Sequence, residues 1–342
     1  MDKFALLVGV SGGAALKLPT VPTACTNAEV LERSLTTPHA GFQVQRLCDG
    51  EHFQMAAQIE QFFRHRDTTD QAFFLFSGYI IQDTDQQLYL TTPASQLDDW
   101  GHLVRSRTIP LHSLVQWMDE SPAHQQVIIF DAWFHRLGGA DPETDPSLES
   151  WFNNMVSDRR VILTASSQMR PLPNPDELET WSYSRYLAEG AETGAADTDC
   201  DGWITVKEWH QYAQRKLHIA IPAQLPQFYA PETPVNQAML HVPSEEPTVR
   251  YRQFLEKLVQ DRDRDATRPP DPTRHDHIDQ TEFRLLTGRN RLNELRQHLG
   301  LSQADAIEIE TAVLRPYWEY QQRKQAFYEY MAQLIEARHG SQ

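Results

Sequence analysis

The sequence has few cysteines and no long apolar run. Its 342 residues include three cysteines, Cys25, Cys48 and Cys200, and no two of them form a CxxC pair. We therefore do not expect a disulfide framework or a zinc ribbon, and a reducing, cytoplasmic setting fits this composition. No stretch approaches the roughly 20 apolar residues that a membrane-spanning helix needs, so we expect no membrane partner.

Basic residues are scarce in most of the chain. The formal net charge is −16, and residues 248–342 contain 15 basic and 15 acidic groups. All of the excess negative charge therefore lies in residues 1–247, which contain 16 basic and 32 acidic groups. An acidic body without a basic stripe argues against nucleic acid as a partner, and it favours basic peptides, cations or basic protein surfaces.

Short apolar runs alternate with amphipathic helical patterns along the first 220 residues. Residues 4–10 have two interpretations, the start of a signal peptide or a buried first strand, and the shortness of the run favours the strand. Further strands are predicted at 42–47, 72–76, 127–130 and 161–165, and a short exposed hairpin arm at 88–90. Helices are predicted at 27–35, 53–63, 111–118, 183–191 and 207–217. This alternation predicts an α/β sandwich with a mainly parallel central sheet.

The chain changes character after residue 220. Six prolines fall within residues 222–247, and the later patterns are helical only. We predict one domain over 1–242, a linker over 243–250 and an all-α module over 251–340. The segment 261–277 is charged and rich in proline, which predicts a loop, and an aromatic stripe over 317–335 predicts the core face of a last helix.

Two strand ends carry the motifs of greatest interest, since function in α/β proteins gathers at the carboxyl ends of parallel strands. The strand at 72–76 runs into Ser77-Gly78-Tyr79-Ile80, and the strand at 127–130 runs into Asp131-Ala132-Trp133-Phe134-His135. Together with the FALLVGV, GFQVQRLCD and PQF segments, in this order and spacing, they resemble the caspase-like cysteine peptidases (peptidase C14 type) of the metacaspase and orthocaspase branch. The resemblance covers about residues 1–242 and implies a caspase-like sandwich. The C-terminal module is similar to helical appendages of cyanobacterial signalling proteins.

The departures from this family concern its catalytic residues. The resemblance implies a His at position 79 and a Cys at position 133, but the chain has Tyr79 and Trp133. It also implies a glycine at position 80, whose backbone amide helps to stabilise the oxyanion, but the chain has Ile80. Neutral tyrosine is a poor base at pH 7, and tryptophan has no nucleophilic atom. We therefore predict a pseudoenzyme that acts as a regulatory or scaffolding protein-binding module.

A second expectation concerns a pocket beside positions 79 and 133. The resemblance implies that Asp131, with Ser77 and Gly78, lines a pocket for a basic side chain, whereas the residues alone leave open a carboxylate that caps nearby amides. We expect Trp133 to pack against Tyr79 as an aromatic plug and Asp131 to form an acidic rim. That rim would accept a basic side chain of a partner or of the Arg-rich segment 261–274.

An alternative keeps catalysis by moving the nucleophile. Cys48, at a strand end, Cys25, before a helix, and His135 are the candidates for an Arg- or Lys-specific cysteine endopeptidase with relocated groups. A serine hydrolase is not indicated, because Ser77 lacks the GxSxG pattern.

A calcium-binding pattern follows at residues 197–208. The loop matches D-x-D-x-D-G-x-I-x-x-x-E, in which the ligands would come from Asp197, Asp199, Asp201, the Trp203 carbonyl, Thr205 and Glu208. The alternative is a tight turn without metal. A calcium-responsive interaction protein is therefore a third hypothesis, with Ca²⁺ as a candidate ligand and no cofactor required. The pair His275 and His277 fits a solvated polar loop better than a metal site.

Overall fold

The computed structural model describes residues 2–12, 14–16, 18–137, 148–166, 168–169, 183–221, 224–231, 238–242, 247–260, 289, 292–297 and 299–315. The chain divides into two compact units. The first comprises residues 1–197 and 203–243, and the second comprises residues 198–202 and 244–342. Within the described residues, no helix combines the length and the apolar character needed to cross a membrane.

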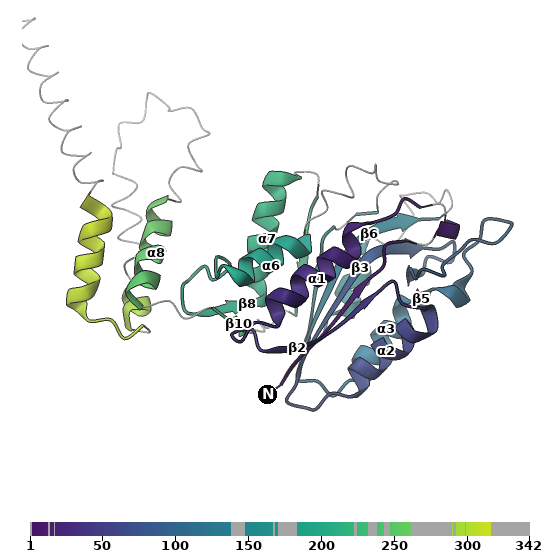
Figure 1. Ribbon diagram of the computed structural model, residues 1–342, viewed down its shortest axis with the longest axis horizontal. Helices are drawn as coiled ribbons and strands as arrows, with labels where there is room; N and C mark the ends of the chain where they lie inside the picture. The colour runs from purple at the N-terminus through teal and green to yellow at the C-terminus, as the bar shows by residue number, and fades with distance from the viewer. Residues whose placement is uncertain are drawn as a thin grey trace, which may run out of the picture. The chain divides into compact units, whose positions relative to one another are not determined.

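A mainly parallel sheet forms the centre of the first unit (Figure 1). Its five parallel strands lie side by side in the order β2 (Phe42–Cys48), β1 (Lys3–Gly9), β3 (Gln71–Gln82), β6 (Gln125–Arg136) and β7 (Arg160–Thr164). The strand β9 (Gln227–Tyr229) joins β7 in the antiparallel direction. Near-continuous apolar sequences form the inner strands because helices cover both of their faces.

Two layers of helices cover the sheet (Figure 1). One face packs against α1 (Thr23–Leu35), α6 (Tyr183–Glu192) and α7 (Val206–Ala220). The other face packs against α2 (His52–Arg64), α3 (Leu111–Glu120) and α4 (Leu148–Met155). Alternate residues of each strand point into one layer or the other, so Phe73 and Leu75 face α6 while Phe74 and Phe76 face α2 and α3.

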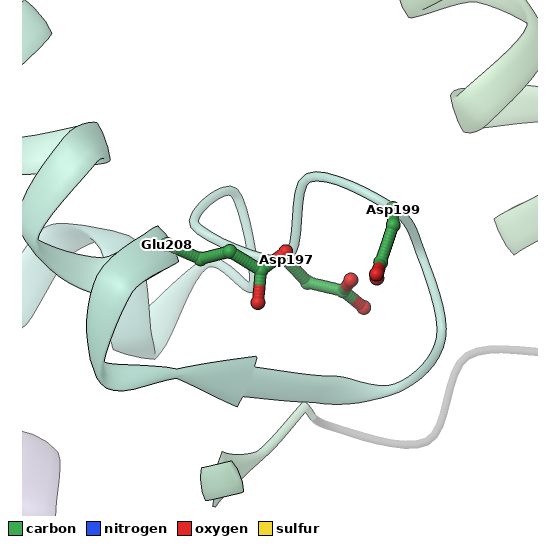
Figure 2. A group of neighbouring side chains, drawn as sticks. All are labelled: Asp197, Asp199 and Glu208. Atoms are coloured by element: carbon green, nitrogen blue, oxygen red, sulfur yellow. The ribbon is translucent and has the colours of Figure 1, made fainter. Parts of the chain in front are cut away.

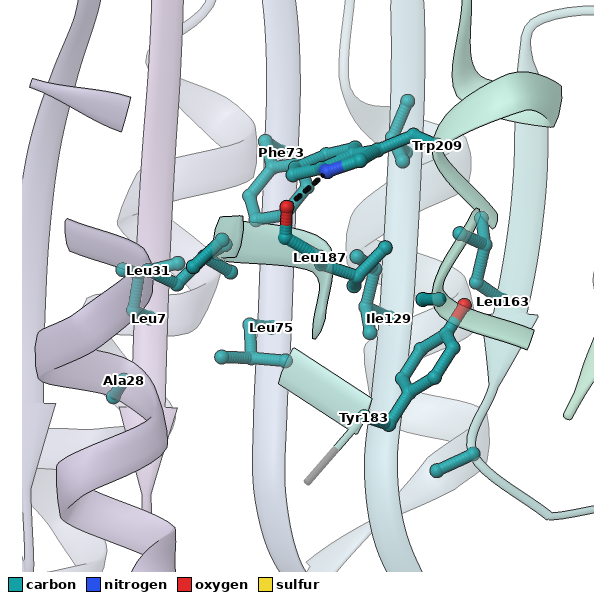
Figure 3. Close-up of a cluster of buried hydrophobic side chains, with 14 of the residues drawn as sticks. Leu7, Ala28, Leu31, Phe73, Leu75, Ile129, Leu163, Tyr183, Leu187 and Trp209 are labelled. Carbon is teal, nitrogen blue, oxygen red and sulfur yellow. Dashed lines mark hydrogen bonds between the residues drawn. The ribbon is translucent and has the colours of Figure 1, made fainter. Parts of the chain in front are cut away.

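The core on the α1–α6–α7 face is tied together by a polar contact. The Trp209 indole is fully buried against Phe73, and its Nε1 donates a hydrogen bond to the Leu187 carbonyl of α6 (Figure 3). A buried indole N–H needs such a partner. This bond connects α7 to α6 above the strands.

Short elements complete the description. The first unit also contains η1 (Ala14–Leu16), η2 (Arg105–Arg107), and the strands β4 (Leu88–Leu90) and β5 (Ile109–Pro110), which extend the sheet from the end of β3. The strands β8 (Trp203–Thr205) and β10 (Ala238–His241) form a separate antiparallel pair.

The second unit is helical where it is described. It contains α8 (Pro247–Gln260) and helical segments at 292–297 and 303–315. Tyr251, Phe254 and Leu255 of α8 pack with apolar residues of these segments, and the Tyr251 hydroxyl donates to Glu310 at 2.6 Å. The segment 198–202 belongs to this unit, where Arg250 of α8 donates to the Cys200 carbonyl at 2.7 Å.

The predicted α/β sandwich with a mainly parallel sheet and C-terminal helices is confirmed. Two expectations about local structure were wrong. The arm at 88–90 is buried, because it pairs with β3 and packs under α3. The strands predicted to end at residues 76 and 130 continue to Gln82 and Arg136. The chain divides after residue 243, close to the predicted boundary at 242, but the grouping of 198–202 with the second unit was not predicted.

Candidate functional site

The two motifs singled out in the sequence lie next to each other in the sheet. Register pairs Ser77 with Asp131 and Tyr79 with Trp133 on the parallel strands β3 and β6. These positions lie within the strands and not at their ends, since pairing continues for three more residues beyond Tyr79. The residues that follow Tyr79 and Trp133 are β-branched or aromatic, which favours extended strand. The two motifs therefore lie inside paired strands, where the sequence predicted the strands to end.

Tyr79 and Trp133 are buried side chains of the same cluster. Their exposed fractions are 0% and 3%, and both belong to the core under α1, α6 and α7. Burial raises the pKa of the Tyr79 phenol well above its ordinary value, so this phenol stays protonated near neutral pH. The Tyr79 carbonyl accepts hydrogen bonds from the backbone and hydroxyl of Thr91, at 3.1 and 3.0 Å.

Gly78, which directly precedes Tyr79 on β3, has a packing role. Its φ of +150° is rarely adopted by other residues, and a Cβ built on it would lie 2.8 Å from the Val10 carbonyl oxygen. The end of β1 approaches β3 so closely here that only glycine fits without a shift of the backbone. Its neighbour Ser77 is fully buried.

Asp131 does not form the acidic rim that the sequence suggested. Its exposed fraction is 1%, and its Oδ2 accepts hydrogen bonds from three groups of the surrounding helices. Asn27 of α1 donates to it at 3.3 Å, and Ser184 of α6 donates through its backbone N–H at 3.1 Å and through its hydroxyl at 2.5 Å. A carboxylate at the N-terminus of a helix is stabilised by unpaired amides there. Asp131 therefore fastens two helices to β6, which agrees with the capping alternative.

A buried pair, Tyr183 and His210, lies next to Ser184, and no pattern in the sequence predicts it. The Tyr183 hydroxyl lies 2.8 Å from Nδ1 of His210, whose ring also packs on Phe228 with ring centroids 5.7 Å apart. Burial lowers the pKa of His210 to about 4, since desolvation disfavours the imidazolium. Burial, and to a lesser extent the Asp131 charge, raises the pKa of Tyr183. Both side chains are therefore neutral near pH 7.

Part of the predicted calcium loop comes together. Carboxylate oxygens of Asp197, Asp199 and Glu208 lie within 4.8 Å of one another (Figure 2). Asp201 lies outside this group, and its backbone N–H donates to Asp199 Oδ1 at 3.2 Å. Oxygen ligands from several carboxylates suit Ca²⁺, so the residues fit such an ion.

The same loop also supports the alternative of a metal-free turn. Glu208 Oε2 accepts from the Thr205 backbone and hydroxyl at 3.0 and 2.8 Å, and Thr205 Oγ1 accepts from the Glu208 backbone, which makes a capping box at the start of α7. The Trp203 ring packs edge-on against His241 of β10, with centroids 4.6 Å apart.

The two cysteines that are candidates for a relocated nucleophile lie apart from Tyr79 and Trp133, whereas His135 lies two residues beyond Trp133 on β6. Cys48 ends β2, and its register neighbour Gly9 of β1 separates it from Ser77 of β3. Cys25 lies in the first turn of α1, and burial raises the pKa of its thiol to about 12. His135 is a partly buried residue of β6. The pair His275 and His277, the segment 261–274 and the stripe at 317–335 lie outside the described residues.

Comparison with known proteins gives little sequence likeness. No family model matches the chain, and no curated protein matches it. Among solved structures, the protein GSU0716 from Geobacter sulfurreducens is similar, with 11% sequence identity and a TM-score of 0.43. That match covers 71% of this chain and 98% of the other.

Proposed function

We propose that this chain is a catalytically silent, caspase-like protein-binding module of the cytoplasm. The observation that carries the proposal is the pairing of Tyr79 with Trp133 inside two continuous, buried strands. The resemblance in the sequence implies a general base and a thiolate at these two positions. A buried phenol of raised pKa and an indole supply neither group.

The cysteines do not favour a relocated nucleophile. The thiolate is the reactive form of cysteine, and a pKa of about 12 leaves Cys25 almost wholly protonated at neutral pH. Cys200 is 4% exposed in the core of the second unit. Cys48 is partly exposed, but it stands two strands away from β3.

Incubation of the full chain with fluorogenic peptides that contain arginine or lysine tests this proposal. We expect no turnover, with or without calcium, and no labelling of Cys25, Cys48 or Cys200 by a substrate-like thiol-reactive probe. Turnover that survives purification and is lost in Cys48→Ala or Cys25→Ala, but kept in Cys200→Ala, would replace the proposal with a relocated cysteine endopeptidase.

A turn between β4 and η2 is the candidate contact for a protein partner. Trp100 is 82% exposed at its tip. The turn is held in shape by Asp98 Oδ1, which accepts from the backbones of Trp100 and His102 at 3.0 and 2.8 Å. A rigid aromatic side chain beside acidic groups suits a partner segment that combines aromatic and basic residues, and tryptophan is enriched among residues that dominate binding energy.

Fluorescence anisotropy with an Arg-rich peptide that carries aromatic residues measures this contact. Trp100→Ala should weaken binding at least tenfold, whereas Phe53→Ala, which removes another exposed aromatic ring of the first unit, should leave it unchanged. Equal effects of the two substitutions would show that the turn is not the docking point. Binding that is independent of salt would contradict the basic character of the partner.

A second candidate function, a calcium-responsive interaction, is favoured by the grouping of Asp197, Asp199 and Glu208. Calorimetry with Ca²⁺ should show one site that is lost in Asp199→Asn. Asp85→Asn is the matched control, since it removes an acidic group that pairs with Arg105 elsewhere in the first unit. Absence of heat at millimolar calcium would leave the loop as a capped turn.

A further inference from the structure

Two of the three cysteines meet at the edge of the sheet. Cys48 Sγ lies 3.9 Å from the Cys25 carbonyl oxygen. Gly9 connects their backbones, because it is the register neighbour of Cys48 and a Cβ built on it would lie 2.9 Å from the Cys25 Cα. Neighbouring strands are about 4.8 Å apart, so the first turn of α1 lies directly over the ends of β1 and β2. The side chains of Cys25 and Cys48 are therefore neighbours, close enough for a hydrogen bond between the two thiols.

The two sulfur atoms have different surroundings. Cys25 Sγ lies 3.7 Å from both the Gly9 carbonyl oxygen and Asp49 Oδ2, which are acceptors for a protonated thiol. Burial raises the pKa of this thiol, and the neighbouring Cys48 thiol raises it further. In contrast, Arg46 Nη1 donates to Cys48 Sγ at 3.6 Å, so a positive charge lies beside this second sulfur. Arg46 is itself fixed by an ion pair with Glu32 of α1.

We propose that Cys25 and Cys48 form an oxidation site at which a hydroperoxide makes a reversible intramolecular disulfide. The Cys48 sulfur attacks one oxygen of hydrogen peroxide, the O–O bond breaks, and the leaving hydroxide takes the Cys48 proton, so that a sulfenic acid and water form. The Cys25 sulfur then attacks the sulfenic sulfur, the S–O bond breaks, and the leaving hydroxide takes the Cys25 proton to give a second water. Two thiols lose two electrons in total, and hydrogen peroxide is reduced to two waters.

The disulfide would affect the contact between Asn27 of α1 and Asp131 of β6. Cys25 lies two residues before Asn27, which donates to the buried Asp131 of β6 at 3.3 Å. A covalent link from Cys25, in the first turn of α1, to Cys48, at the end of β2, would restrict the movement of that turn away from the sheet. Oxidation should therefore stabilise the contact between α1 and the sheet. This inference does not depend on the proposed function.

Peptide mapping of the full chain tests the link directly. The reduced protein is treated with hydrogen peroxide and then denatured at acidic pH in the presence of N-ethylmaleimide, which blocks every remaining thiol, the buried Cys200 included. Trypsin then separates the three cysteines into peptides 18–33, 47–64 and 186–207. We expect peptides 18–33 and 47–64 to be joined, the number of free thiols to fall from three to one, and dithiothreitol to restore all three. The oxidised protein should melt several degrees higher than the reduced protein.

Serine variants provide matched controls, because serine replaces only the sulfur atom and its hydroxyl cannot form a disulfide. Cys25→Ser and Cys48→Ser should each lose the joined peptides, while Cys200→Ser should form them as wild type does. Cys25→Ser should accumulate sulfenic acid on Cys48, which a dimedone probe detects. Joined peptides that include 186–207, sulfinic acid on Cys48 without any link, or three free thiols after peroxide would each overturn the proposal.

Discussion

Acidification from pH 7 to pH 5 should destabilise the first unit through one buried histidine. His210 is 3% exposed, and burial lowers its pKa to about 4 in the folded protein. The unfolded chain has no such burial, so the same imidazole titrates near ~6.5 there. Between about pH 4 and pH 6.5, the imidazole of His210 is therefore protonated in the unfolded state and neutral in the folded state.

The sign and size of the effect follow from this difference. The folded pKa lies below the unfolded pKa, so the stabilisation is fully present above pH 6.5 and is lost as the pH falls towards 4. Each unit of difference corresponds to ~1.4 kcal/mol, which gives a loss of about 2 kcal/mol between pH 7 and pH 5. Protonation would also place a charge beside the Tyr183 hydroxyl and the Phe228 ring, in a core without bulk water.

Urea unfolding at the two pH values measures this loss, with His210→Gln as the control. Glutamine keeps a polar side chain near Tyr183 but does not titrate, so the difference between the two proteins isolates His210 from all other acidic and basic groups. Wild type should lose about 2 kcal/mol more than the variant over this range. The reasoning fails if both proteins lose the same amount, or if the NMR titration of the His210 ring gives a pKa near 6.5.

Three further results are expected. Asp131→Ala should reduce the free energy of unfolding by about 3 kcal/mol, because it removes a carboxylate that accepts bonds from Asn27 and Ser184, and Asp131→Asn should fall in between, as measured by urea unfolding. Gly78→Ala should be destabilising by about 3 kcal/mol, whereas Gly101→Ala, which also has a positive φ but no atom near its new methyl group, should lose only about 1 kcal/mol in the same assay. Tyr79→His combined with Trp133→Cys should leave peptide cleavage undetectable, since both positions remain buried in continuous strands; turnover would mean that the strands open at these residues.

Much of the fold could be predicted from the sequence because the inner strands are almost wholly apolar. The runs at 4–10 and 127–130 have the composition that a strand covered by helices on both faces requires. The ends of β3 and β6 were predicted too early for a physical reason. The Ser77-Gly78 pair after residue 76 is typical of a strand end, yet Tyr79, Ile80 and Ile81 are good strand formers and pair with β6 without interruption.

The environment of Asp131 could not be predicted in the same way. Its partners lie 104 and 53 residues away along the chain, so the contacts exist only after α1 and α6 have packed on the sheet. The Tyr183–His210 pair spans two helices for the same reason. Local patterns predict which face of a helix is buried, but they do not determine which polar groups meet across that face.

The pairing of Tyr79 with Trp133 also shows that these two side chains act together in the core. Register neighbours on parallel strands point to the same face, so their side chains share one volume beneath α1 and α6. A phenol and an indole fill that volume, and truncating a buried tryptophan typically costs about 3–5 kcal/mol. Truncating either side chain alone would leave a cavity beside the other, and truncating both would leave a larger one. These residues therefore contribute to the stability of the core, and a function in binding has to be sought on the surface, where the Trp100 turn and the Cys25–Cys48 edge lie.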